Sequence, residues 1–205
     1  MTRTAKTTTL TTYITDMHGL INHGLRAIDR QAALLARTGS QVEALAALHE
    51  FQRVLRGHRT RLAARAGELG GTTHWPLKDL VTTLTGAVAG LMNALRPEPT
   101  AKAFRDDYTF LSHVAVGYLM LHTTASGLGD AATAALAEQG YTDVARLVMH
   151  IDQILPALVL QELRQDDLEV VPISDQTIVM VHRAWDREAG RAGSRGEQTA
   201  QGPAA

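Results

Sequence analysis

The sequence predicts an all-α fold in which long helices share one core. Apolar residues recur at helical spacing over several long stretches, and strand-like alternation is limited to the short run 168–171. Hydrophobic residues make up 45% of the 205 residues and aromatic residues only 4%, as in cores where Leu, Val, Ile and Ala pack helix on helix. We therefore expect four long helices, one shorter crossover helix and a C-terminal accessory helix.

The first half of the chain has the pattern of three helices. The first is expected over residues 8–36, with the apolar stripe Leu10, Tyr13, Ile14, Met17, Ile21, Leu25 and Ile28. Ser40 and Glu43 have the spacing of a capping box for the second helix. That helix should run to about Leu69, with the stripe Leu45, Leu48, Phe51, Leu55, His58 and Leu62. A third helix is expected over 76–95, because a proline suits its first position.

The second half is expected to contain two further long helices. One covers residues 103–125, with the stripe Phe104, Asp107, Leu111, Val114, Tyr118, Leu121 and Ala125. After a helix-weakening run at 126–129, Asp130 should cap a short continuation that ends at Gly140. Thr142 or Asp143 should then open the next helix, with the stripe Val144, Val148, Ile151, Leu155, Leu158 and Glu162.

The C-terminal part is expected to be an appendage of the bundle. Ser174 is a suitable cap for an amphipathic helix whose stripe is Ile178, Val181 and Trp185. The low-complexity sequence that follows predicts a disordered tail. The expected organisation is therefore a helical bundle over 1–167, a C-terminal amphipathic helix over 168–189 and a disordered tail over 190–205.

The composition argues against several classes of function. The net charge of -1, from 20 basic and 21 acidic residues, gives no general attraction to nucleic acid or to anionic lipid. The chain has no cysteine, which excludes disulfides, thiolate metal sites and cysteine nucleophiles. The N-terminal sequence lacks the apolar segment of a secretion signal, and no apolar run is long enough for a transmembrane helix. We expect a cytoplasmic protein with neither a nucleic-acid nor a membrane partner.

The sequence also argues against a metal pair in the bundle. Helical bundles of this size often hold two metal ions between inward-facing Glu residues and Glu-x-x-His steps. This chain contains no Glu-x-x-His step. The inward positions where carboxylates would be needed carry Ile21, Phe51, Val54, Leu111, Val114, Val148 and Ile151.

Three stretches of the chain resemble the YciE/YciF-type ferritin-like family. They are YITDMHGL at 13–20, the LKDL step at 77–80, and Gly117-Tyr118-x-x-Leu121 followed by the run 125–130. The resemblance covers residues 8–165 and implies a ferritin-like four-helix bundle. It also implies a bacterial stress-related protein, often a dimer, with a di-metal site between the four long helices.

The metal ligands that the resemblance implies are missing at the matching positions. They fall on or near Ile21, Phe51, Val54, Leu111, Val114, Val148 and Ile151, or near His58 and Arg61 if the second helix is shifted in register. Buried carboxylates repel one another without a cation, and apolar replacement of buried charges is often neutral or stabilising. The expectation is therefore a ferritin-like scaffold with a degenerate metal site.

Two functional hypotheses follow. The first is a non-enzymatic bundle without a cofactor, acting by protein association or by binding a small apolar ligand. Its partner would be a second copy in a homodimer, or another protein bound through the C-terminal helix. The residues expected to line an apolar ligand pocket are Ile21, Phe51, Val54, Leu111, Val114, Tyr118 and Ile151.

The second hypothesis is a metal- or haem-dependent oxidoreductase that uses inward-facing histidines. Its cofactor would be iron, manganese or haem, and its candidate ligands are His18, His58, Asp107 and His122. Each of these residues has an alternative interpretation as a hydrogen-bonded core or flank residue. For His58 we expect the structural role, because the cation of Arg61 nearby disfavours a bound metal ion.

Overall fold

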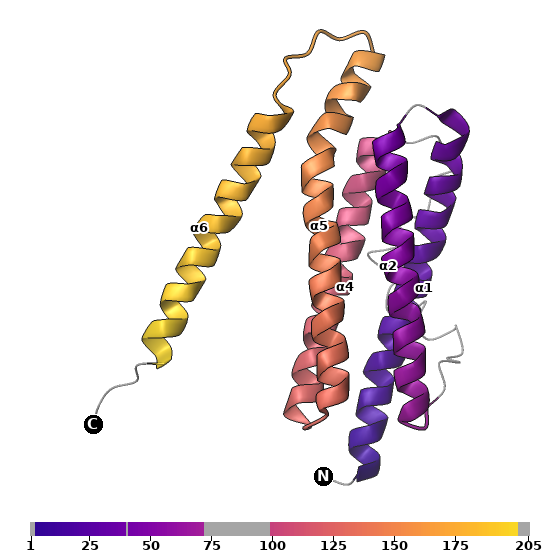
Figure 1. Ribbon diagram of the computed structural model, residues 1–205, viewed down its shortest axis with the longest axis vertical. Coiled ribbons are helices and arrows are strands. Elements are labelled where there is room, and N and C mark those ends of the chain that lie inside the picture. The colour runs from indigo at the N-terminus through magenta and orange to yellow at the C-terminus, as the bar shows by residue number, and fades with distance from the viewer. Residues whose placement is uncertain (1–2, 40, 72–98, 201–205) are drawn as a thin grey trace. The chain divides into compact units, whose positions relative to one another are not determined.

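The computed structural model describes residues 3–39, 41–71 and 99–200, and side chains as far as residue 190. This part of the chain forms five helices (Figure 1), which are α1 (Arg3–Thr38), α2 (Val42–Glu68), α4 (Thr100–Gly127), α5 (Ala131–Gln165) and α6 (Ser174–Ala200). The described ranges contain no strand, at 168–171 or elsewhere, so the all-α prediction is confirmed for them. The third predicted helix, at 76–95, lies outside the described residues.

The chain divides into two compact units, Met1–Ile151 and Asp152–Ala205, called unit 1 and unit 2 here. The division falls inside α5 and not after residue 167, where we expected the bundle to end. A single continuous helix belongs to both units. Pro156 lies inside this helix, and because proline has no backbone N–H, the carbonyl of Asp152, where unit 2 begins, lacks its helical hydrogen bond. Across the described part of the chain, no helix combines the length and the apolarity needed to cross a membrane.

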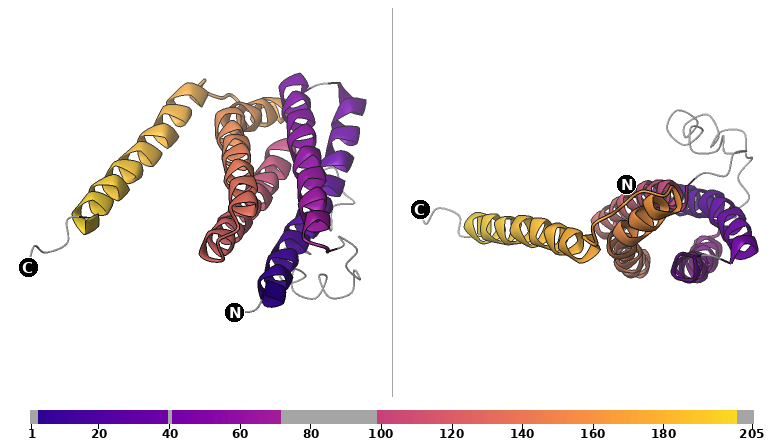
Figure 2. Two further views of the ribbon diagram at one scale, coloured as in Figure 1. Left: turned by 60° about the horizontal axis from the view of Figure 1, so that its bottom comes forward. Right: turned by 90° about the horizontal axis from the view of Figure 1, so that it is seen from above.

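The neighbouring helices of unit 1 are antiparallel. The helix α2 begins four residues after α1 ends, and a short turn at 128–130 joins α4 to α5. The helix α1 packs against both α2 and α4 (Figures 1 and 2). The pairs that show this order are Asn22–Arg59 and Asp29–Gln52 between α1 and α2, Met17–Gly117 and Gly24–Phe110 between α1 and α4, and Glu50–His150 and Arg65–Asp130 between α2 and α5.

By contrast, α2 and α4 run parallel. The ring centroids of Phe51 and Phe104 are 6.0 Å apart, and those of His58 and Tyr118 are 5.3 Å apart. Both pairs advance along their helices in the same direction. The end of α2 and the start of α4 therefore lie at opposite ends of unit 1.

The buried faces of α1, α2 and α4 follow the predicted stripes. Every predicted inward residue of α4 is buried, whereas Tyr13 of α1 and Leu45 of α2 are only partly so. In α5 the prediction needs a correction, because Leu147 and Ile154 are buried in the places of Val148 and Leu155. Each buried residue directly precedes the predicted one, so a small rotation of α5 exchanges them.

The structure also corrects the predicted start of the fifth helix. Asp130 is the cap, since its carboxylate accepts a hydrogen bond from the Thr133 backbone N–H at 2.9 Å, but α5 then continues through Gly140 without a break. The Tyr118 ring occupies the space that a Cβ at Gly140 would need. Gly140 thus permits a close approach between α4 and α5 and does not end a helix. Consequently Asp143 lies inside α5 and caps nothing.

Two predicted helix ends also differ from the structure. Gln41 precedes α2 and makes no capping hydrogen bond with its side chain, so the predicted capping box with Glu43 is not seen; Ser40 lies outside the described residues. At the other end of the chain, α6 extends to Ala200, through most of the segment 190–205 that we expected to be disordered. Low complexity indicates little apolar surface, but the Ala, Arg, Glu and Gln residues there are good helix formers.

Candidate functional site

A chain of three polar side chains lies in the interior of unit 1. The Tyr118 Oη is 3.0 Å from His58 Nδ1, and His58 Nε2 is 3.1 Å from Asp143 Oδ2. The three residues come from α4, α2 and α5, so the chain of hydrogen bonds links three helices. His58 and Tyr118 are each 1% exposed.

The protonation states of this network follow from its geometry. An ionised Asp143 carboxylate can only accept hydrogen bonds, so His58 carries its proton on Nε2 and donates a hydrogen bond to the carboxylate. The other ring nitrogen, Nδ1, accepts a hydrogen bond from the hydroxyl of Tyr118. Burial lowers the pKa of His58, and the hydrogen bond to Asp143 opposes this only in part. Burial also raises the pKa of the Tyr118 hydroxyl. The network therefore contains a neutral tyrosine, a neutral histidine and an ionised aspartate.

Asp143 connects the buried network to the surface. Its Oδ1 accepts hydrogen bonds from Gln139 at 3.0 Å and from Arg146 at 2.7 Å, and its Oδ2 lies 3.3 Å from the Arg61 guanidinium. Burial alone would raise the pKa of Asp143, but the hydrogen bonds from His58, Gln139 and Arg146 outweigh burial and lower it. One carboxylate thus satisfies donors on two helices.

The residue types of the network are those of an acid–base relay, but the geometry does not serve one. A relay needs a reactant within hydrogen-bond reach of the hydroxyl or the imidazole. Both ring nitrogens of His58 are already occupied, and Tyr118 is closed off from solvent. The arrangement therefore holds three helices in register and leaves no atom free for a substrate or a metal ion.

A second buried polar group lies elsewhere in α4. Asp107 is 6% exposed, and its Oδ2 has no hydrogen-bond partner among the described residues. Burial raises the pKa of Asp107 to about 7; the nearby Gln31 side chain lowers it and the charge of Asp106 raises it further. This carboxyl group is therefore close to half-protonated at neutral pH.

The structure does not gather the four residues of the alternative metal site. His58 is committed to Tyr118 and Asp143, and Asp107 has Gln31 as its neighbour. His18 is half-buried, and burial together with the Arg59 charge lowers its pKa. His122 is also partly exposed. Throughout the described ranges, no group of three His, Asp or Glu side chains is placed to hold a metal ion.

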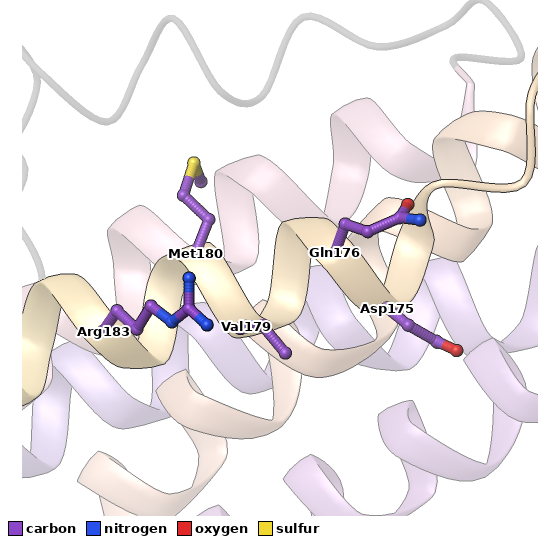
Figure 3. Close-up of a pocket in the computed structure, with 5 residues that line it drawn as sticks. All are labelled: Asp175, Gln176, Val179, Met180 and Arg183. Atoms are coloured by element: carbon purple, nitrogen blue, oxygen red, sulfur yellow. The ribbon is translucent and has the colours of Figure 1, made fainter.

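The seven residues expected to line an apolar pocket are buried in unit 1. None of them is more than 7% exposed; they are Ile21, Phe51, Val54, Leu111, Val114, Tyr118 and Ile151. A groove of 340 Å³ lies along one face of α6 (Figure 3). Its lining residues are Asp175, Gln176, Val179, Met180 and Arg183.

Two features of these sites are not anticipated by the sequence stripes. Asp143 was assigned to a helix end, although Gln139 and Arg146 at helical spacing around it were a signal of side-chain pairing within one helix. The α6 groove does not coincide with the predicted stripe of Ile178, Val181 and Trp185. Val179 and Met180, which line the groove, lie on the other side of the helix. The expected inward position of His58 is correct.

Comparison with known proteins adds no family to this description. No family model, curated protein or solved structure matches the chain.

Proposed function

We propose that this chain is a non-enzymatic, ferritin-like bundle with a degenerate metal site, which acts by associating with protein. The observation that carries the proposal is that both ring nitrogens of His58 are already hydrogen-bonded within the protein. Their partners are Tyr118 and Asp143, in the buried centre of unit 1. The histidine best placed to be a ligand is therefore already satisfied by the protein.

The order of the helices supports the ferritin-like part of the proposal. Unit 1 contains two antiparallel pairs, and α2 runs parallel to α4. Two antiparallel pairs joined by one long crossover connection are the arrangement of ferritin-like bundles. The three stretches that resemble the YciE/YciF-type family point to the same arrangement.

The residues around the centre support the loss of a metal site. Apolar side chains with little or no exposure occupy the places where ligands would be needed: Ile21, Phe51, Val54, Leu111, Val114 and Ile151. The one buried carboxylate nearby, Asp143, is already paired with Arg61 and Arg146. A bound dication would have to displace these guanidinium groups and compete with their charge.

The outer face of α4 supports association with protein. Val116, Leu119 and Met120 lie at helical spacing and are each at least half exposed. The sequence contains no charged residue from Tyr108 to Gly129. An uncharged helix face with large apolar side chains is typical of a protein contact surface. For a small apolar ligand inside the bundle, no observation among the described residues gives comparable support.

The first test concerns the centre of the bundle. We expect the purified full chain to contain neither stoichiometric iron or manganese nor a haem absorption band. Nitrogen NMR should show His58 as the neutral tautomer with its proton on Nε2. A bound metal, a haem spectrum or a freely titrating His58 would overturn the degenerate-site proposal.

The second test concerns the α4 face. Replacing Leu119 and Met120 together by Gln should weaken the association of the chain with protein. Sedimentation measures this for self-association, and binding to the isolated partner measures it for another protein. Val42→Gln is the matched control, because Val42 is an exposed apolar residue outside α4. Equal effects of the control and the double variant would remove α4 as the contact surface.

A further inference from the structure

The helix α6 has a second face besides the one predicted from its apolar stripe. Within unit 2, Ile178 and Val181 are half-buried, and Trp185 donates a hydrogen bond to Asp152 of α5. This face is therefore turned toward the last part of α5. Val179 and Met180 lie on the other side of α6 and are 45% and 59% exposed.

The charges on this second face are placed symmetrically. Asp175 lies four residues before Val179 and Arg183 lies four residues after it, and all three line the groove (Figure 3). Eight residues of helix span about 12 Å, so the two charges are too far apart to pair with each other. Among the described residues of unit 2, neither side chain has an ion-pair or hydrogen-bond partner. The groove thus has an acidic end, an apolar centre and a basic end.

We propose that this groove binds the same groove of a second copy of the chain, as an antiparallel pair of α6 helices with its two-fold axis at Val179. The two-fold axis places Asp175 against the partner's Arg183, and Arg183 against the partner's Asp175. Val179 and Met180 pack between the two ion pairs. A two-fold contact uses the same patch on both copies, so a self-complementary patch is what it requires.

The charge pattern also selects the orientation of the pair. A parallel arrangement in register would place Asp175 beside Asp175 and Arg183 beside Arg183, which is repulsive at both ends. Only the antiparallel arrangement makes both contacts attractive while keeping Val179 at the centre. The inference rests on the proposed function, since it names a second copy as one partner of a protein that acts by association.

The test is a charge exchange in the full-length chain, followed by sedimentation velocity. Asp175→Arg leaves two positive ends on the face, and Arg183→Asp leaves two negative ends. Each variant alone should lose self-association by roughly tenfold or more, because both symmetric contacts become repulsive. An equimolar mixture should associate again, because each copy then meets opposite charges at both ends. Arg53→Asp on α2 is the control for a charge change elsewhere.

The outcomes separate this inference from the proposed function. Circular dichroism should show unchanged helix content in both variants, since both positions are exposed on α6. If wild type and both variants self-associate equally, association uses another surface: the α6 pairing is overturned and the proposed function remains. A mixture that stays as dissociated as its components, or a wild-type chain that never self-associates, also overturns the pairing. A metal or haem in the bundle would overturn the proposed function without affecting the charge exchange.

Discussion

Two acidic side chains of unit 1 are both little exposed yet have opposite electrostatic character. Asp143 is 9% exposed and Asp107 is 6% exposed, and burial is the largest influence on both and raises the pKa of each. Asp143 accepts hydrogen bonds from His58, Gln139 and Arg146, and its pKa falls below the ordinary value. Asp107 has one oxygen without a partner, and its pKa rises to about 7. The depth of burial of a carboxylate and the donors around it together decide its charge.

The same contrast explains what each site contributes to the fold. The Asp143 network fixes α2, α4 and α5 relative to one another, because each link would leave a buried polar atom unsatisfied if it were broken. Asp107 offers no comparable link. We therefore expect changes at the network to destabilise unit 1 and a neutral replacement at Asp107 to stabilise it.

The largest loss of stability is expected when a mutation introduces a third buried carboxyl group that has no hydrogen-bond donor near it. Val114→Glu should lower the free energy of unfolding by about 4 kcal/mol at neutral pH, because Val114 is fully buried between apolar neighbours. Val116→Glu, two residues along α4 and 53% exposed, should change it by less than about 0.5 kcal/mol. Urea denaturation of both variants measures the difference. Similar losses would show that the inward face of α4 is wrongly placed.

Removing the acceptor at the centre of the network, the Asp143 carboxylate, should cause the next largest loss of stability. Asp143→Ala leaves the Nε2–H of His58 buried without a partner and should cost about 3 kcal/mol. Asp143→Asn keeps one carbonyl oxygen for that N–H and should cost less. The control is Asp166→Ala, an exposed residue just after α5. A loss no larger than that of the control would mean that His58 finds another acceptor.

A neutral residue at Asp107 should stabilise the protein in a pH-dependent way. The folded-state pKa of Asp107 is about 7, above its ordinary value of 3.8, so its contribution to stability is complete below pH 3.8 and is lost as the pH rises through 7. Asp107→Asn removes this loss. The variant should be about 4 kcal/mol more stable than wild type at pH 8 and nearly equal to it at pH 4.

Denaturation of wild type and Asp107→Asn across this pH range gives the test. Taking the difference between the two proteins cancels the titration of the histidines that both contain. Asp166→Asn is the control for a neutral replacement at an exposed aspartate. A stability difference that does not vary with pH would contradict a raised pKa at Asp107.

The contrast between the two aspartates also marks what the sequence could predict. The apolar repeat of α4 placed Asp107, Leu111, Val114 and Tyr118 inside correctly, because a period of 3.6 residues identifies a buried face. The repeat could not show whether a buried polar residue has a hydrogen-bond partner, since that partner comes from another helix. Asp143 was missed because Gly140 suggested a helix end. Only the packed Tyr118 ring shows why a glycine is needed there.

The smallest change is expected at His58, when its hydrogen-bonding pattern is preserved. In His58→Gln, the amide oxygen can accept from Tyr118 and the amide nitrogen can donate to Asp143. We expect a loss of about 1 kcal/mol, from the smaller side chain in a buried site. His58→Leu has a similar size but leaves Tyr118 and Asp143 without their shared partner, so it should cost clearly more. Thermal or urea denaturation at neutral pH compares the two variants. If Gln and Leu are equally harmful, His58 does more than link two neighbours, and a bound metal or haem would again have to be sought at this residue.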